Sequence, residues 1–578
     1  MIRTSVILGV GVLTAAVVSS VAQDKNYVPV TPEMLLHPSP DDWLMYSRTY
    51  DAQRYSPLKE INRANVGQLR MVWTRGMGAG ITETIPIVHN GVIYVVEPGA
   101  MVAALDGANG DLLWEYKRKV PANAAASART KDLAIYQDVV VYSAPDGFIV
   151  GLDARTGETR WQTPTGEGNN TSGSIIVDGK AITGKGCGKT RDTCFIAAYD
   201  ALTGKEVWKF YNVPAPGEPG SESWGTPFLN TNLASTWGLP GTYDPVRKQL
   251  YWGIANAMPN TRLERHGGNP DGTSRTAPAD LYSNSTVSLD PATGNLNWYY
   301  QHLPGDDWDQ DYTHERTLVR AKFNPDPRYV KWLNPDVKRG EERDMAVMVG
   351  EGGGVFALDR GNGQFLWATP FPYDDPLFLI SNIDGRTGKT TINFDLVNKK
   401  PGERHTICFY NTRSFWPTAY HPGANSLYVP YIDNCLDMTS KSEAGPERRG
   451  PVPQPGSDPK KLTGIGKINL STGEILHFDE GRSPSYGAVL TTAGDLVFHG
   501  DMNRRFRAFD VYTGKQLWEA IVGGHVSVST ISYAARGKQY IAIMTGDGLT
   551  DGGPLNETPE LKPPKGSNAI FAFALPGK

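Results

Sequence analysis

The amino-acid sequence predicts an all-β fold, an eight-bladed β-propeller with tryptophan-docking repeats, and three observations support this prediction. A short phrase recurs along the chain: Leu, Tyr or Phe, then Asp, two residues, Thr or Asn, Gly, three residues and Trp. Strand-like alternation surrounds each copy, and the early copies recur every 47 residues, as a radially repeated sheet requires. The copies end at Trp114, Trp161, Trp208, Trp298, Trp367 and Trp518. The 63 Gly and 42 Pro residues suit a chain rich in turns.

Each copy combines a tight turn with a docking aromatic side chain. The Gly supplies a positive φ, the Asp and Thr side chains bond their own backbone, and the Trp on the next strand packs over the neighbouring blade. A degenerate copy runs from Asn469 to His477, and Trp73 marks an early blade, which gives about eight units. Unrelated hairpins with similar turns would explain one or two copies but not seven.

The first 22 residues resemble a secretory signal peptide. Arg3 precedes an apolar run from Val6 to Val18, and small residues at 20–22 form a cleavage site. The apolar run is short for a membrane span, so we expect cleavage and export. The mature chain, residues 23–578, is then a single propeller domain, and nothing in it resembles a membrane span.

Charge and cysteine content exclude two classes of function. The net charge is −4 with both signs interspersed, so no basic surface for nucleic acid is expected. Four cysteines in an exported chain favour disulfides, with Cys187 and Cys194 closing a short loop and Cys408 and Cys435 a longer one. No Cys-x-x-Cys-His motif is present, which excludes covalent c-type haem, so any electrons must leave through another protein.

Two long insertions interrupt the repeat, at about 209–285 and about 368–460. In propellers such excursions build one face of the ring, where function is concentrated. Neither insertion reads as a linker between domains.

The segment 305–315 holds the densest group of acidic residues. Its five carboxylates repel one another, which raises the pKa of some of them. Oxygen ligands on a loop are those that Ca²⁺ takes, so a hard cation would relieve the repulsion. The alternative interpretation is an ordinary acidic surface loop.

Three segments then come in the order and spacing found in the pyrroloquinoline quinone (PQQ)-dependent alcohol dehydrogenases, and the chain resembles that family. They are Trp237 within 235–245, Asn256 within 251–260, and Trp308-Asp309. The runs at 83–86, 486–494, 500–501 and 537–540 are also similar to the family, so the resemblance covers nearly the whole mature chain. The branch it indicates lacks both the family's vicinal Cys-Cys pair and a haem domain.

The resemblance implies a role for each matching residue. Trp237 matches the Trp that stacks on the planar quinone. Asp309 matches the general base that takes the proton of the alcohol while hydride passes to the quinone. The implied metal ligands are Asn256, Asp309 and Asp311, and the implied cofactor contacts are Glu83, Lys131 with Arg129 as its alternative, Thr171, Ser172, Asn411 and Trp416.

The sequence also departs from the family pattern. Ala125-Ala126 replaces the Cys-Cys pair, which implies a roomier pocket, and Glu351 stands where a cation near the quinone is common. The metal-ligating Glu has no match between Lys185 and Cys194, where a backbone oxygen or Asp192 is the substitute. Asp311 coincides with the extra carboxylate of lanthanide-dependent methanol dehydrogenases, so Ca²⁺ is the expected metal and a lanthanide its alternative.

Three hypotheses about function follow. The first is a periplasmic PQQ- and metal-dependent dehydrogenase that oxidises a secondary, polyol, sugar or bulky alcohol and passes electrons to a soluble cytochrome c. The second is a non-catalytic propeller scaffold that binds partner proteins at the outer membrane. The third is a dehydrogenase fold that has lost its cofactor. The ordered series of Trp237, Asn256 and Asp309 favours the first.

Overall fold

The computed structural model of the protein describes residues 27–126, 128–410, 412–440, 446–526 and 528–577. The expected signal peptide and Asn411 lie outside the described residues. Within these ranges, no helix combines the length and the apolar composition that crossing a bilayer requires.

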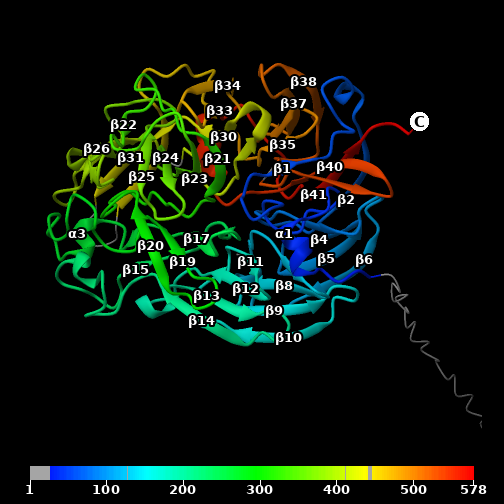
Figure 1. Cartoon of the computed structure of the whole chain (residues 1–578), viewed down its shortest axis with the longest axis horizontal. Helices are drawn as coiled ribbons and strands as arrows, with labels where there is room; N and C mark the ends of the chain where they lie inside the picture. The colour runs from blue at the N-terminus through cyan, green and yellow to red at the C-terminus, as the bar shows by residue number, and fades with distance from the viewer. Residues whose placement is uncertain (1–26, 127, 411, 441–445, 527, 578) are drawn as a thin grey trace, which may run out of the picture.

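The strands form sheets arranged radially around a central axis (Figure 1), and the predicted all-β propeller is confirmed. In the described part of the chain, eight sheets have four or five strands, antiparallel except where the short β1 (Tyr55–Ser56) pairs parallel with β35. The first four sheets contain β3 (Ile87–His89), β4 (Val92–Glu97), β5 (Met101–Asp106) and β6 (Leu112–Lys117); β7 (Ala134–Tyr136), β8 (Val139–Ala144), β9 (Phe148–Asp153) and β10 (Thr159–Pro164); β11 (Ser174–Val177), β12 (Lys180–Gly184), β13 (Phe195–Asp200) and β14 (Glu206–Tyr211); β16 (Thr242–Asp244), β17 (Gln249–Gly253), β19 (Ser285–Leu289) and β20 (Leu296–Gln301).

The other four complete the ring. They contain β21 (Thr317–Lys322), β23 (Glu342–Gly350), β24 (Gly353–Asp359), β25 (Phe365–Thr369) and β22 (Trp332–Leu333); β29 (Ala419–His421), β30 (Ser426–Ile432), β33 (Thr463–Asn469) and β34 (Ile475–Gly481); β1, β35 (Leu490–Thr492), β36 (Leu496–Gly500), β37 (Arg505–Asp510) and β38 (Gln516–Ile521); β39 (Ile531–Ala535), β40 (Lys538–Thr545), β41 (Ala569–Ala574) and β2 (Arg70–Gly76).

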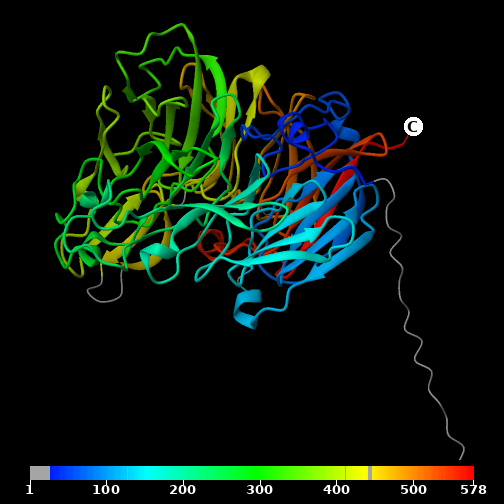
Figure 2. The same ribbon diagram turned by 60° about the horizontal axis from the view of Figure 1, so that its bottom comes forward.

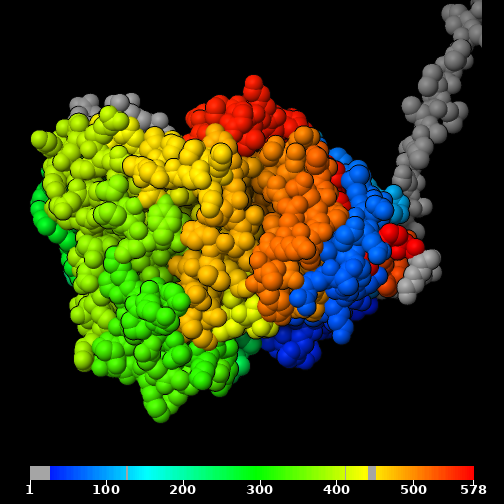
Figure 3. Space-filling view, turned by 90° about the horizontal axis from the view of Figure 1, so that it is seen from above, coloured from blue at the N-terminus to red at the C-terminus, as the bar shows by residue number. Residues whose placement is uncertain are grey.

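The last of these sheets closes the ring, because its outer strand comes from the other end of the chain. β2 pairs antiparallel with β41, from Arg70 opposite Ala574 to Gly76 opposite Ala569. Figure 3 shows the orange and red C-terminal segments directly against the blue N-terminal segment. Closure leaves no open sheet edge between the first and last blades.

The recurring phrase forms the turns and inter-blade contacts that it predicts. Asp106 Oδ1 accepts from Ala108 N at 2.8 Å inside the turn, and Trp114 Nε1 donates to the Ala154 carbonyl of the next blade at 3.0 Å. Gly110 has φ +78°, and a Cβ there would lie 2.6 Å from the Trp73 ring. Both the backbone conformation and the lack of space for a side chain therefore favour glycine at this position. His477 lies opposite Gly466 on β33, at the place where the other copies carry Trp.

Both expected insertions are shorter than the sequence suggests. β16 and β17 lie inside the first, and β29 and β30 inside the second, yet all four belong to blade sheets. Short innermost strands are buried on both faces and therefore show little alternation, which is why they were not recognised. The remaining excursions carry α3 (Arg262–Arg265), the pair β15 (Leu233–Ala234) and β18 (Ala257–Met258), the pair β26 (Ile380–Ile383) and β27 (Thr390–Ile392), and the sheet of β28 (Arg404–Cys408), β31 (Asn434–Ser440) and β32 (Pro446–Pro453).

The remaining helices are equally short. They are α1 (Pro32–Leu36), α2 (Ala122–Ala126) and α4 (Gly552–Glu557). The light-blue α2 projects below the strands in Figure 2. Ala125-Ala126, which the sequence resemblance implies in place of a Cys-Cys pair, lies at the end of this helix.

Candidate functional site

The residues singled out in the sequence come from different blades but share one position in them. Most stand just before the innermost strand of a sheet, and Asn256 and Glu351 just after the second strand. Because these two strands are antiparallel, the start of one and the end of the other meet at the same face of the ring. The residues before innermost strands are Glu83 before β3, Lys131 before β7, Thr171 and Ser172 before β11, Trp237 before β16, Asp309 and Asp311 before β21, and Trp416 before β29.

The acidic segment 305–315 is a buried loop and not an acidic surface loop. Asp306 accepts from the backbone N–H groups of Trp308 and Gln310 at 2.6 and 2.8 Å, and so shapes the turn between them. Asp307 accepts from Arg262 N and from both Asn398 nitrogens, which joins this loop to its neighbours. These two carboxylates therefore stabilise the conformation of the loop. The candidate catalytic and metal-binding groups are other residues of the segment.

Asp309 stands at the apex of the turn that Asp306 holds. Its φ is +63°, in the left-handed region that Asp tolerates better than most residues. Its side chain is half-buried, whereas those of Asp306 and Asp311 are buried. The one acidic side chain of this turn that remains accessible is thus the predicted general base.

Asp311 joins the predicted aromatic platform to the predicted metal ligands. Its Oδ2 accepts a hydrogen bond from the indole Nε1 of Trp237, and its Oδ1 accepts from the backbone N–H of Asn256 at 2.8 Å. The Asn256 side chain donates through Nδ2 to Ala257 O and Asn260 Oδ1, which leaves its Oδ1 as a ligand atom. Trp237, Asn256 and Asp311 therefore form one hydrogen-bonded unit.

Glu351, which replaces the expected cation, lies against the same unit. Asp311 N donates to Glu351 Oε2 at 2.8 Å, and Glu351 N donates to the Asp311 carbonyl at 3.1 Å. Burial and then the nearby charge of Asp309 raise the pKa of Asp311 to about 7. Burial and then Asp311 raise the pKa of Glu351 well above its usual range. Three carboxyl groups, those of Asp309, Asp311 and Glu351, are therefore concentrated here, and burial favours the neutral forms of Asp311 and Glu351 in the absence of a cation.

A second group of residues also lies close to the Trp237 ring. Lys131 is fully buried and forms an ion pair with Glu83, and its Nζ is 5.2 Å from the Trp237 ring centroid and 4.6 Å from that of Phe415. Burial lowers the pKa of Lys131 even though Glu83 opposes this effect. Arg129 Nε lies 3.9 Å from Glu83 Oε2, so Lys131 is the closer of the two candidate cations.

Two of the predicted cofactor contacts already have structural partners. Thr171 Oγ1 donates to the Trp237 carbonyl at 2.7 Å, and Ser172 Oγ donates to the Gly184 carbonyl at 2.9 Å. The Thr171 hydroxyl joins two adjacent blades at Trp237, and the Ser172 hydroxyl joins the start of β11 to the end of β12 within one blade. Trp416 is buried against Tyr486, with ring centroids 4.3 Å apart, and its indole Nε1 has no hydrogen-bond partner among the described residues.

Both expected disulfides are present, Cys187–Cys194 and Cys408–Cys435. The first closes the loop after β12, on the face that carries the site, and the second joins directly opposite residues of β28 and β31. Asp192, the substitute ligand considered for the first loop, is exposed to solvent, unlike Asn256 and Asp311.

The side chains fit a cofactor-bound hard cation better than a metal held by protein alone. In the described ranges, no group of three or more His, Cys, Asp or Glu side chains is arranged to hold a metal ion. Asn256 and Asp309 supply oxygens only, and such oxygens suit Ca²⁺ when further ligands come from a cofactor. The buried Glu83 Oε1 has no hydrogen-bond partner among the described residues, so a polar ligand group would satisfy it.

Comparisons with known proteins identify the family of the chain. Residues 43–370 and 464–541 match the family described as glucose/ethanol/alcohol dehydrogenase, beta-propeller domain, of the PQQ class. Quinohemoprotein alcohol dehydrogenase ADH IIB of Pseudomonas putida is 30% identical over 93% of this chain and 78% of its own length. The corresponding ADH-IIG of the same species is 29% identical over 88% and 73%.

Solved structures show the same fold. The quinohemoprotein alcohol dehydrogenase ADHIIG from Pseudomonas putida HK5 superposes with a TM-score of 0.79 and 24% identity, covering 95% of this chain and 83% of that one. A europium-containing methanol dehydrogenase superposes with a TM-score of 0.80 and 24% identity, covering 94% and 100%.

The chain therefore belongs to the PQQ-dependent alcohol dehydrogenase family. It is an oxidoreductase that acts on CH–OH groups, and the family implies PQQ and a metal ion as cofactors. This assignment favours the dehydrogenase hypothesis over the scaffold.

Sequence reasoning missed two kinds of residue. Phe415, beside Trp237 and Lys131, was not singled out, although its place in the aromatic pair with Trp416 was a usable signal. The arginines of α3 were also missed. Nothing in their local pattern indicates that they contact a loop 41 to 43 residues further along the chain.

Proposed function

We propose that this protein is an exported, periplasmic alcohol dehydrogenase in which Asp309 is the general base beside a quinone bound on Trp237. The observation that carries the proposal is the hydrogen-bonded unit of Trp237, Asp311 and Asn256. This unit holds Trp237, the aromatic platform, and the oxygen ligands Asn256 and Asp311 in one arrangement. Asp309 lies two residues before Asp311 in the sequence, and its side chain is accessible.

The side chains divide the work by their chemistry. Asp309 accepts the hydroxyl proton of the alcohol, which makes the carbinol carbon a better hydride donor. Trp237 orients the cofactor ring, and Lys131 with its Glu83 partner provides polar groups at the ring edge. When bound, PQQ with its metal supplies a polarised carbonyl that accepts the hydride.

We further propose Ca²⁺ as the metal, with a lanthanide as the alternative that Asp311 keeps open. A carboxylate whose pKa is raised to about 7 by burial and by Asp309 is one that a cation would strongly stabilise in its ionised form. The same added charge favours a trivalent over a divalent ion. The relative affinity for Ca²⁺ and for a lanthanide depends on whether Asp311 ligates the metal or only holds Trp237 and Asn256.

The proposed substrates are secondary, polyol, sugar or otherwise bulky alcohols, and the proposed electron acceptor is a soluble cytochrome c. Small alanines at the end of α2, in place of a rigid Cys-Cys pair, support a roomier pocket. The chain has no Cys-x-x-Cys-His motif, which supports an external electron carrier.

The test is dye-linked oxidation of a panel of primary, secondary, polyol and aromatic alcohols by purified apoprotein. PQQ is added with Ca²⁺, with La³⁺ or with no metal, and horse-heart-type cytochrome c then replaces the dye. We expect activity that needs both quinone and metal and that is greatest for secondary or bulky alcohols. Activity confined to methanol and ethanol would contradict the substrate proposal, and no quinone binding under any condition would overturn the proposed function.

A further inference from the structure

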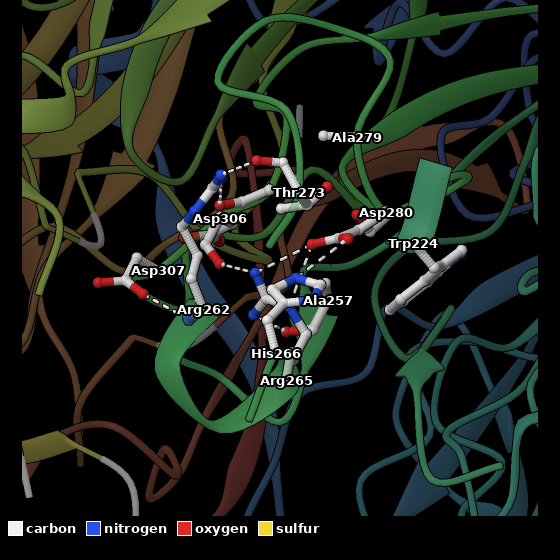
Figure 4. Close-up of polar contacts among 12 residues, drawn as sticks. Trp224, Ala257, Arg262, Arg265, His266, Thr273, Ala279, Asp280, Asp306 and Asp307 are labelled. Carbon is white, nitrogen blue, oxygen red and sulfur yellow. Dashed lines mark hydrogen bonds and ion pairs between the residues drawn. The ribbon is translucent and has the colours of Figure 1, made fainter. Parts of the chain in front are cut away.

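Helix α3 lies between the two segments that carry the candidate metal ligands. Asn256 follows β17, Asp309 and Asp311 precede β21, and α3 belongs to the excursion that starts directly after Asn256. Figure 4 shows two arginines of this helix, Arg262 and Arg265, directed towards the loop that contains Asp306 and Asp307. The helix begins with a capping box between Thr261 and Glu264, so its first turn is fixed locally.

Arg265 contacts both segments with one guanidinium group. Its NH1 donates to the carbonyls of Pro259 and Asn260 at 2.7 and 2.8 Å, immediately after Asn256. Its NH2 donates to the Asp306 carbonyl at 2.6 Å, in the turn that presents Asp309. The side chain is fully buried, so water does not compete for these bonds.

Asp280 holds this guanidinium group in place. Its Oδ2 accepts from Arg265 Nε at 3.1 Å and lies 3.0 Å from NH2, and both side chains are fully buried. The Nε edge and the two amino groups of Arg265 are therefore all occupied, each in a fixed direction. A flexible side chain would not maintain so many contacts at once.

Arg262 reinforces the same connection. Its backbone N–H donates to Asp307 Oδ1 at 2.6 Å, and its NH1 donates to the Gly305 carbonyl at 3.0 Å. Its other contacts, to Pro270, Thr273 and Ser274, are to the carbonyls of its own excursion. Arg262 thus fixes α3 against the loop, and Arg265 sets where the two segments lie relative to each other.

We propose that Arg265 is a positioning residue that sets the separation between Asn256 and the loop of Asp309 and Asp311, and thereby the metal affinity of the site. The inference rests on the proposed function and deepens it. Residues that orient the ligands of a metal without touching it commonly change its affinity by about 10- to 100-fold when they are replaced. The planar fork of Arg is what spans the two segments, so Lys is not an equivalent replacement.

The experiment compares Arg265→Lys and Arg265→Met with Arg54→Met in the full chain. Arg54 is a matched control, because it is also fully buried and donates to backbone carbonyls, those of Tyr46, Val489 and Thr530. Hydrogen exchange of the apoprotein measures protection in segments 254–261 and 303–315. We expect both segments to lose protection together, at least tenfold, in Arg265→Met, with Arg265→Lys intermediate and Arg54→Met unchanged there.

A second measurement on the same proteins follows the binding of PQQ by quenching of tryptophan fluorescence and then titrates Ca²⁺ and La³⁺ separately. We expect PQQ affinity within about twofold of the parent protein, a metal affinity lower by about 10- to 100-fold, and a lower kcat at saturating metal with little change in KM. If Arg265→Met does not fold, Arg265→Lys gives the same comparison.

The outcomes separate the two proposals. Parent-like protection and parent-like metal affinity in a folded Arg265 variant would overturn the positioning role. An equal loss of metal affinity in Arg54→Met would also overturn it, by showing a general effect of lost stability. A parent protein that binds neither PQQ nor metal would refute the proposed function, while the exchange measurement would still decide whether Arg265 joins the two segments.

Discussion

At the scale of single residues, environment assigns different roles to similar side chains in one loop. Asp306 and Asp307 are buried and accept several backbone N–H groups, so they build the loop. Asp311 is buried beside another carboxylate and has a raised pKa of about 7. Asp309, at the positive-φ apex, is the accessible one. Local sequence alone does not distinguish these four carboxylates, because the difference lies in what surrounds them.

The role of Asp309 gives the first prediction. Asp309→Asn keeps the shape of the side chain but removes the base, so we expect kcat to fall roughly 10²- to 10⁴-fold. PQQ binding through Trp237 should remain, as measured by fluorescence quenching. Asp374→Asn, which changes a surface carboxylate that is 61% exposed, is the control and should keep parent activity. Activity near the parent level in Asp309→Asn would rule out its role as the base.

A buried histidine away from the site gives a prediction about pH. Burial and then Arg507 on the paired strand lower the pKa of His499 to about 3. Its pKa is lower in the folded than in the unfolded chain, so the unfolded chain binds the extra proton. Stability is therefore lost as the pH falls from about 6.5 towards 3, by roughly 5 kcal/mol in total. Urea unfolding between pH 4 and 7 should show a smaller pH dependence for His499→Gln, and no such change for the exposed His37→Gln.

At the scale of elements, short irregular excursions between strands supply much of the site. The second strand of each blade ends on the face where the innermost strand begins, so Asn256 and Glu351 meet Trp237 and Asp311 there. Two of the excursions are cross-linked: Cys187–Cys194 closes one, and Cys408–Cys435 joins β28 to β31. The cross-links restrict these segments in the unfolded chain and so stabilise the folded protein.

The two disulfides should differ in their contribution to stability. Their sequence separations are 7 and 27 residues, and the entropy lost by the unfolded chain grows with loop length. Replacing both cysteines of each pair by Ser should cost roughly 2 kcal/mol for Cys187–Cys194 and roughly 3.5 kcal/mol for Cys408–Cys435. Denaturant unfolding of the two double variants measures the difference. The reverse order would show that native-state contacts, and not chain entropy, determine the effect.

At the scale of the whole molecule, the fold depends on closure of the ring by the two ends of the chain. β41 lies between β40 and β2, so without it β2 loses its partner and β40 loses one of its two partners. The interior residues of β41 are apolar and buried, in a core that they share with residues of the neighbouring strands β4 and β37.

Removal of β41 should therefore prevent folding. A chain that ends at Ser567 leaves the edges of β2 and β40 unpaired, and we expect aggregation or loss of the cooperative thermal transition. A chain that lacks only residues 576–578 is the control and should melt as the parent does. Circular dichroism with temperature measures both. A cooperative transition in the chain that ends at Ser567 would show that the remaining blades form a stable open ring.

The sequence by itself determined the propeller class, the turn and docking residues, both disulfides and the series Trp237, Asn256 and Asp309. These follow from local chemistry: positive-φ turns, alternation, a repeated Trp and a recognisable order of motifs. It did not reveal the short innermost strands, because buried three-residue strands carry no alternation. From the sequence alone, the acidic segment was predicted to be a single group of carboxylates that repel one another.

Only the tertiary structure decided which residues share the site. Glu351 appeared in the sequence as a missing cation, yet it is hydrogen-bonded to Asp311 from the neighbouring strand end. Arg265 connects two loops about 50 residues apart. It does so through backbone carbonyls, which every residue has, so no pattern of side chains in the sequence marks these contacts. The physical reason is the same in both cases: the contacts depend on ring closure and strand direction, which bring distant loops to one face, and no local pattern records them.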